Sequence, residues 1–118
     1  VYGDGNYVRD YVYIDDVVSA FLCAAVAKNI EGELFNIATG VGHTLKEAFS
    51  LVAARVSDIT KKKVNINEIP WPEGVNPIEK RNFVASIDKF KKFTGWEPTI
   101  NLDEGIYRLV SFYMKNHA

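Results

Sequence analysis

The chain has 118 residues, of which 47% are hydrophobic and 25% are charged, and its formal net charge is −1. A nearly neutral chain creates no long-range field that favours nucleic acid or a membrane surface, and no apolar run is long enough to span a bilayer. These values are typical of one globular domain, so residues 1–118 are expected to form a single unit. The lone Cys23 can form no internal disulfide, which fits a reducing, cytoplasmic environment.

The first 27 residues predict a strand followed by a helix. Side chains alternate in an extended chain, so Arg9 shares a face with the tyrosines around it, and residues 11–14 predict a strand. The apolar residues 17–27 predict a helix, with Asp15 or Asp16 as its N-terminal cap. Because this helix is apolar on nearly all sides, we expect it to be buried between layers.

The middle of the chain predicts two more strands and a long helix. Residues 34–38 form a short apolar run typical of a strand, and residues 39–42 form a loop. Thr44 and Glu47 have the spacing of a capping box, which predicts the start of an amphipathic helix. Residues 64–69 alternate between apolar and polar side chains, as a half-buried strand does.

The last third predicts a short strand and two helices. Residues 83–85 indicate the strand, and Ser86 is placed to cap a helix at residues 87–94 that Gly95 ends. Asn101 is the expected cap of the final helix. The fold class is therefore α/β, with about four helices and three or four short strands. Such short, scattered strands predict a layer that leans on another structure rather than a complete doubly wound sheet.

Three polar side chains are the candidate binding residues. Arg9 precedes the first predicted strand and can make a bidentate, charge-assisted contact with a phosphate, although an ion pair with Asp10 or Asp15 is the alternative. Asn36 lies inside an apolar run, where a buried amide needs hydrogen-bond partners or simply bonds the backbone at a strand end. Arg81 is a second candidate cation, with a plain surface charge as the alternative.

Patterns of several common enzyme sites are absent from the sequence. His43 and His117 are far apart with no neighbouring ligands, which argues against zinc. The sequence contains neither Gly-x-Ser-x-Gly nor Tyr-x-x-x-Lys, and the Gly-x-Gly pairs at residues 3–5 and 40–42 are too short for a dinucleotide fingerprint. Its two tryptophans are more typical of core or loop anchors than of base-stacking platforms. No catalytic residue is therefore assigned.

Five segments of the chain, taken in order, resemble the extended short-chain dehydrogenase/reductases, which include UDP-glucose 4-epimerases and dTDP-glucose 4,6-dehydratases. Residues 2–16 (YGDGNYVRDYVYIDD) resemble the segment that opens the substrate-binding part of these enzymes. The other four are residues 35–40 (FNIATG), 84–89 (VASIDK), 94–98 (TGWEP) and 102–106 (LDEGI). The resemblance therefore covers essentially the whole chain.

This resemblance implies the C-terminal, nucleotide-sugar-binding portion of an NAD(P)-dependent epimerase or dehydratase of UDP- or dTDP-hexoses, with the Rossmann core largely absent. In the family, the glycine-rich NAD(P) loop and the Tyr-x-x-x-Lys pair lie upstream of this segment, so the isolated chain is expected to bind no NAD and to be inactive. Arg9 is expected to contact the substrate diphosphate, and Asn36 to hydrogen-bond near it. Many epimerases have an arginine at the position of Asn76, for which Arg81 is the candidate substitute.

The expected partners are the nucleotide-sugar substrate and an N-terminal Rossmann domain, and a homodimer is left open. Without the Rossmann domain, apolar surface would be exposed and self-association would follow. Two alternatives stay open. One is a non-catalytic binding or regulatory protein with the same fold, and the other is a related reductase that acts on a non-nucleotide substrate.

Overall fold

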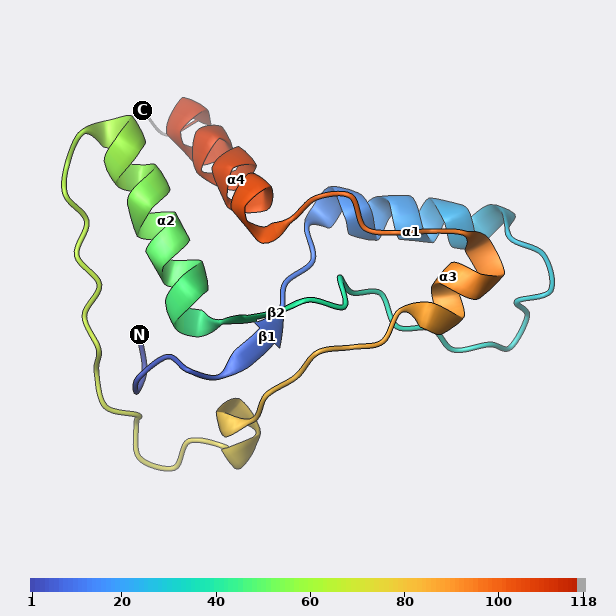
Figure 1. Ribbon diagram of the computed structural model, residues 1–118, viewed down its shortest axis with the longest axis horizontal. Coiled ribbons are helices and arrows are strands. Elements are labelled where there is room, and N and C mark those ends of the chain that lie inside the picture. Colours follow the sequence, from blue (N-terminus) through green and yellow to red (C-terminus); the bar gives the residue numbers. More distant parts are fainter. Residues whose placement is uncertain (117–118) are drawn as a thin grey trace.

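Four α-helices, two short strands and one 3₁₀ turn make up the computed structural model, which describes residues 1–116 (Figure 1). In chain order they are β1 (Val8–Asp10), α1 (Ile14–Val26), β2 (Gly42–Thr44), α2 (Leu45–Thr60), η1 (Pro77–Lys80), α3 (Asp88–Thr94) and α4 (Leu102–Asn116). The four predicted helices are confirmed. The prediction of three or four strands was too high for the described part of the chain.

The molecule is flat and extended. It measures 51 × 38 × 20 Å and has a radius of gyration of 17.1 Å, whereas a domain of this length has a radius of about 13.5 Å. In Figure 1, α2 and α4 lie side by side at one end, α1 and α3 lie at the other, and the two strands lie between them. The described residues are therefore not arranged around one central core.

The two strands form a short antiparallel pair at the centre of the molecule. The paired residues are Val8 with Thr44, Arg9 with His43 and Asp10 with Gly42. A Cβ on Gly42 would lie 2.5 Å from Val8 Cγ1 and 2.7 Å from Val84 Cγ2, so only glycine allows this close approach. The prediction of a strand at residues 11–14 was wrong, because the partner strand is opposite the three residues before them.

A third segment runs along the other edge of β1. The Phe83 N–H donates to the Val8 carbonyl at 3.0 Å, and the Ala85 N–H donates to the Asp10 carboxylate at 3.4 Å. From the first contact to the second, both chains advance by two residues, from Phe83 to Ala85 and from Val8 to Asp10. The segment therefore runs parallel to β1. The strand predicted here does not form, because the Asn82 side chain accepts the Val8 N–H (2.9 Å) that a ladder would use.

Two other predicted strands are extended segments without a ladder. Residues 34–38 form no strand, and residues 64–69 contribute only an isolated parallel bridge between Ile69 and Tyr2. Alternation of side chains sets which face each residue presents, but a strand also needs a neighbouring backbone to bond. Within residues 1–116, residues 34–38 have no such neighbour, and residues 64–69 have one only at their end, where Ile69 bonds the backbone of Val1 and Gly3.

Helix α1 begins without the predicted side-chain cap. Tyr13 is the N-cap residue, so Asp15 and Asp16 lie in the first turn, where the helix dipole still favours their negative charge. Asp16 is 3% exposed and accepts three hydrogen bonds, from Thr99 N (3.0 Å), Thr99 Oγ1 (2.9 Å) and Ile100 N (2.9 Å). It therefore fastens the linker before α4 to the start of α1.

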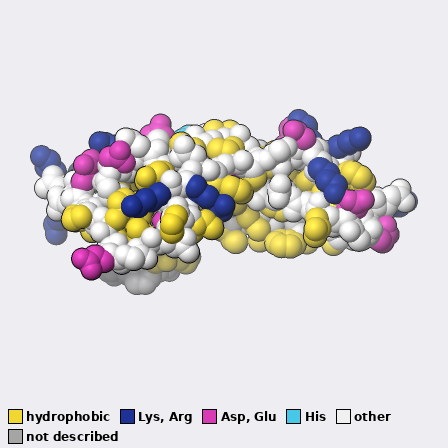
Figure 2. Space-filling view, turned by 90° about the horizontal axis from the view of Figure 1, so that it is seen from below, with side chains coloured by type: hydrophobic (Ala, Val, Ile, Leu, Met, Phe, Trp, Pro, Cys, Tyr) yellow, Lys and Arg dark blue, Asp and Glu magenta, His cyan; other side chains and the backbone are white. Residues whose placement is uncertain are grey.

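The expectation that α1 would be buried between layers was wrong for the described chain. One side of the helix packs through Ala20 against a small core of Phe90 and Trp96. The opposite side, here called the α1 apolar face, is between 50% and 81% exposed and consists of Ile14, Val18, Phe21, Leu22 and Val26. Their spacing places these side chains on one stripe of the helix. Figure 2 shows hydrophobic side chains along one margin of the molecule in the region of α1.

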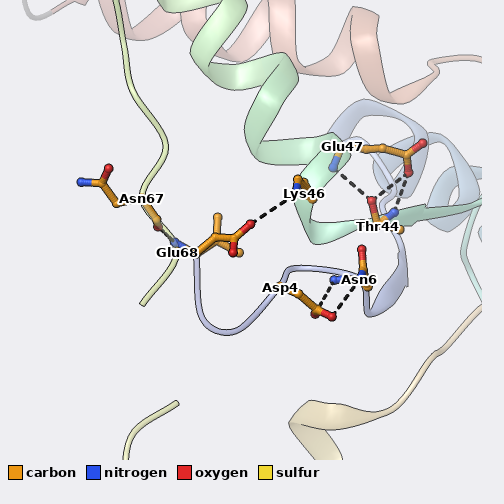
Figure 3. A network of polar contacts seen from close by, with 8 residues as sticks. Asp4, Asn6, Thr44, Lys46, Glu47, Asn67 and Glu68 are labelled. Carbon is orange, nitrogen blue, oxygen red and sulfur yellow. Dashed lines mark hydrogen bonds and ion pairs between the residues drawn. The ribbon is translucent and has the colours of Figure 1, made fainter. Parts of the chain in front are cut away.

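The predicted capping box at the start of α2 is confirmed (Figure 3). The Thr44 hydroxyl accepts the Glu47 N–H at 3.1 Å, and the Glu47 carboxylate accepts the Thr44 N–H at 2.7 Å. These hydrogen bonds lower the pKa of Glu47 below its usual value. In the same view Lys46 reaches Glu68 at 3.2 Å, which ties the exposed segment after α2 back to the start of the helix.

The predicted ends of the last two helices are largely confirmed. Gly95 ends α3 in the left-handed conformation (φ 73°), which glycine adopts without strain. The Asn101 side chain accepts the Glu104 N–H at 2.9 Å at the start of α4. The Ser86 hydroxyl accepts the Asp88 N–H at 3.3 Å, but α3 begins one residue later than predicted.

Replacing Asp16 with alanine is expected to lower the free energy of unfolding by about 3 kcal/mol, because two backbone N–H groups and a hydroxyl lose a charged acceptor. Urea unfolding measures this loss. Asp15→Ala is the matched control, since Asp15 is exposed, and it should change stability by no more than about 0.5 kcal/mol. Equal losses in the two variants would contradict the role given to Asp16.

Candidate functional site

Arg9 is the middle residue of β1, and backbone carbonyl groups surround its guanidinium. Nη1 donates to the Val8 carbonyl at 2.9 Å and to the Arg81 carbonyl, and Nη2 donates to the Glu79 carbonyl at 2.7 Å. These contacts hold the end of η1 and the residue after it against β1. The structure therefore brings two of the candidate residues, Arg9 and Arg81, together.

Arg9 keeps part of its donor capacity. A guanidinium has five N–H donors, and three of them are used in the contacts with carbonyl groups. The ion pair considered as its alternative role does not form within residues 1–116, because Asp10 accepts backbone N–H groups and Asp15 lies 3.7 Å from Arg108 Nη1. The two unused donors are Nε–H and one N–H of Nη2, and these are the groups that could contact a phosphate.

The Arg81 side chain is exposed and lies over the ring of Phe83. The distance from its guanidinium carbon to the ring centre is 5.5 Å, which is within the range of a cation–π contact. It forms no salt bridge within the described residues. Arg81 is thus an exposed second cation, and the contact that it makes with Arg9 is through its backbone carbonyl.

Asn36 lies in an exposed position, not the buried one that its apolar neighbours predicted. Its side-chain amide donates to the Ser86 carbonyl at 3.4 Å, a long hydrogen bond. No contact within residues 1–116 joins Asn36 directly to Arg9. The backbone-bonding role that the sequence left open is therefore the one observed.

The three candidate residues nevertheless share one segment of chain, residues 81–86. Arg9 bonds the carbonyl of Arg81 at one end of it, and Asn36 bonds the carbonyl of Ser86 at the other. Five residue steps span at most about 18 Å in an extended chain. The candidate site is therefore a strip, with both arginines at one end and the asparagine amide at the other.

Asp10 is the polar residue whose part in this arrangement the sequence did not reveal. Its Oδ1 accepts from Thr39 N (2.8 Å) and Thr39 Oγ1 (2.5 Å), and its Oδ2 accepts from Gly40 N (2.9 Å) and Ala85 N (3.4 Å). From the sequence it was considered only as an ion partner of Arg9. The one signal was the Thr-Gly pair after residues 34–38, which offers consecutive N–H groups to an acceptor.

A pocket opens beside Tyr11, between the residues around β2 and the linker before α4. Its lining residues include Tyr11, Thr39, His43, Ile100 and Leu102. Burial raises the pKa of Tyr11 above its usual value of 10.0, and the nearby positive charge of Arg9 partly opposes this shift. None of these residues had been singled out from the sequence as a binding residue.

The two tryptophans act as anchors, as predicted. Trp96 is buried, and its indole N–H donates to the Ser19 hydroxyl at 2.8 Å. Trp71 stacks on Tyr2 with ring centres 5.5 Å apart, and Lys80 lies 5.8 Å from its ring centre. Trp71 thereby fixes the loop before η1 against the N-terminal turn.

Neither a metal site nor a dinucleotide loop is formed in the described part of the chain. Residues 1–116 contain no group of three or more His, Cys, Asp or Glu side chains that could hold a metal ion. Gly3 and Gly5 (φ +64° and +69°) lead into β1, and Gly40 (φ +73°) leads into β2. A dinucleotide fingerprint requires glycines between a strand and a helix, so these residues do not fit NAD. In the same range, no helix is long and apolar enough to cross a bilayer.

Comparisons with known proteins identify the family. A family model described as GDP-mannose 4,6 dehydratase matches residues 1–109. The chain belongs to the extended short-chain dehydrogenase/reductase family of nucleotide-sugar epimerases and dehydratases. The family that the five sequence segments resemble is thus confirmed.

Individual members of this epimerase and dehydratase family match nearly the whole chain. A putative UDP-glucose 4-epimerase of Methanocaldococcus jannaschii is 35% identical over 117 residues, which cover 99% of this chain and 34% of the relative. The crystal structure of a UDP-glucose 4-epimerase of Thermotoga maritima with UDP-glucose aligns with a TM-score of 0.81 and 36% identity, over 100% of this chain and 35% of that one. A dTDP-glucose 4,6-dehydratase of Bacillus anthracis in complex with NAD aligns with a TM-score of 0.78 and 25% identity, over 98% and 34% of the two chains. The chain therefore spans about a third of the length of the family members it matches.

Substituting Tyr11 with phenylalanine is expected to remove a pH dependence of stability in the alkaline range. A raised pKa means that folding favours the neutral phenol, so this contribution is complete below the usual value of 10.0 and is lost as the pH rises through the folded-state value. Urea unfolding of both proteins between about pH 9 and about pH 12 measures the effect. A constant difference between the two proteins over this range would contradict the assignment.

Proposed function

We propose that this chain is the C-terminal, nucleotide-sugar-binding portion of an NAD-dependent epimerase or dehydratase that acts on a UDP- or dTDP-hexose. The observation that carries the proposal is Arg9, a guanidinium held rigidly by three backbone carbonyl groups with two donors left for an anion. The support from relatives is that the Thermotoga maritima enzyme was crystallised with UDP-glucose.

In this proposal the positively charged end of the strip takes the diphosphate. Arg9 makes the bidentate contact, Arg81 adds an exposed second cation, and Asn36 supplies a neutral donor further along residues 81–86. A diphosphate fixed in this way would orient the attached sugar, and binding energy remote from the reacting atoms would then serve the reaction.

The chemistry itself is proposed to lie outside this chain. In the complete enzyme, bound NAD would take a hydride from the sugar and return it, and this chain would contribute by holding the substrate. Residues that fit NAD are not found among residues 1–116, so the isolated chain is expected to show no turnover with added NAD and nucleotide sugar. We place the complete enzyme in the cytoplasm.

The surface of the chain supports a missing partner, which we propose to be the N-terminal Rossmann domain. The α1 apolar face is exposed, and α1 carries no charge after its first turn. Beside it, residues 34–38 are extended, Leu34 is 87% exposed, and backbone N–H and C=O groups of Phe35 and Ile37 make no hydrogen bonds within residues 1–116. A layer of strands and helices against this surface would bury the α1 apolar face and would pair the backbone groups of residues 34–38.

Replacing Arg9 with alanine is expected to weaken binding of UDP-glucose by about tenfold or more, because a charge-assisted bidentate contact is lost. Isothermal titration calorimetry on the 118-residue chain measures the affinity. Arg9→Lys keeps the charge but not the two parallel donors, and it should fall between wild type and Arg9→Ala.

Arg108→Ala is the matched control for this experiment. Arg108 lies on α4, where it pairs with Glu104 at 2.7 Å, so its removal should leave the affinity unchanged. Equal binding of UDP-glucose by wild type and Arg9→Ala would refute the phosphate role of Arg9 and, with it, the proposed function.

The isolated chain is expected to self-associate through the α1 apolar face. Phe21→Glu combined with Leu22→Lys should make it monomeric and change the free energy of unfolding by no more than about 0.5 kcal/mol, because both side chains are more than half exposed. Sedimentation velocity over a range of concentrations measures the association.

Phe112→Glu serves as the control, since Phe112 is 61% exposed but lies on α4. It should associate as wild type does. A wild-type chain that stays monomeric at high concentration would contradict the prediction.

A further inference from the structure

We propose that Asp10 is a positioning residue for the nucleotide diphosphate, acting through Asn36 and residues 81–86 rather than by touching the ligand. This inference rests on the proposed function, because it concerns the same strip of candidate residues. No part of the sequence pattern assigned such a role to Asp10.

The first argument is that Arg9 and Asp10 form hydrogen bonds with different segments of the chain. Successive side chains of a strand point to opposite faces. Arg9 donates to the carbonyl groups of Glu79 and Arg81. Asp10 accepts from the N–H groups of Thr39, Gly40 and Ala85. Two adjacent residues of β1 thus bring together all the segments that carry the candidate site.

The second argument is that Asp10 closes a ring of contacts around Asn36. Asn36 lies three residues before Thr39, and its amide bonds the carbonyl of Ser86, the residue after Ala85. Asp10 binds both Thr39 and Ala85, so it holds the two chain segments on either side of the Asn36 contact. The Asn36 contact and the Ala85–Asp10 contact are both long, at 3.4 Å, but the negative charge of Asp10 strengthens only the second.

The third argument is chemical. One carboxylate accepts four hydrogen bonds here, two on each oxygen, and its negative charge makes each of them stronger than a neutral bond. An asparagine in its place would have one accepting oxygen and would turn its NH₂ group toward N–H donors. The arrangement around Asp10 is therefore specific for a carboxylate.

The experiment compares Asp10→Asn with Asp16→Asn in the ¹⁵N-labelled 118-residue chain, with UDP as the probe. Asp16 is a matched control, because it is also a carboxylate that accepts backbone N–H groups, but from the linker before α4. Titrations followed by NMR give the dissociation constant and the responses of the Arg9 Nε–H and Asn36 side-chain signals. They are run where urea unfolding shows each variant to be fully folded.

The wild type and Asp16→Asn are expected to bind UDP equally, with both signals responding. Asp10→Asn should bind about tenfold more weakly, which corresponds to about 1.4 kcal/mol, and its Asn36 signal should no longer respond although the Arg9 signal does. General destabilisation would not separate the two signals in this way.

Thr39→Val provides a second variant in case Asp10→Asn does not fold. It removes the hydroxyl donor to Asp10 and leaves the carboxylate in place, so it should weaken UDP binding in the same direction by a smaller factor. Suppose that Arg9→Ala loses UDP binding. Wild-type affinity in Asp10→Asn would then overturn the positioning role, and Thr39→Val replaces Asp10→Asn in this test if that variant is unfolded. Wild-type affinity in Arg9→Ala as well would overturn the proposed function and this inference together.

Discussion

Two carboxylates, Asp10 and Asp16, accept hydrogen bonds from backbone N–H groups that lie outside any β-ladder, and the rest of the fold depends on these contacts. The strands are only three residues long, so long irregular segments must find other acceptors for their polar groups. Asp16 accepts the N–H groups of Thr99 and Ile100, and Asp10 accepts those of Thr39, Gly40 and Ala85. Each carboxylate joins residues that are 29 to 84 positions apart in the sequence. A fold with little regular pairing is held by side chains that are charged and nearly saturated with donors.

The same constraint explains why the candidate site lies where it does. β1 has β2 on one edge and residues 82–85 on the other. The side chains of β1 add two more contacts: Arg9 bonds η1, and Asp10 bonds the loop before β2. A ligand held by Arg9 would therefore be bound to the part of the molecule on which several segments converge, which would suit the proposed role of orienting a substrate.

Local signals in the sequence predicted the helices and their ends well, because these depend on neighbouring residues. The capping box at Thr44 and Glu47, the Asn101 cap and the Gly95 stop each require only a few consecutive positions. Strand predictions failed for the opposite reason, since residues 34–38 are an apolar run typical of a strand but have no backbone bonded to them within residues 1–116. For the site, Arg9 and Arg81 could be selected by their chemistry, whereas Asp10 could not, because its four donors come from two distant segments.

The sequence by itself determined the family and the four helices, since both are written in short runs of adjacent residues, and it singled out Arg9 as the candidate cation. Only the tertiary structure decided which residues pair as strands, which carboxylate is buried and which side of α1 stays exposed. Asp15 and Asp16 are alike in sequence, yet one faces solvent and the other accepts three hydrogen bonds from the linker before α4. That difference depends on the direction from which a segment more than 80 residues away returns to α1, and no local pattern contains this information.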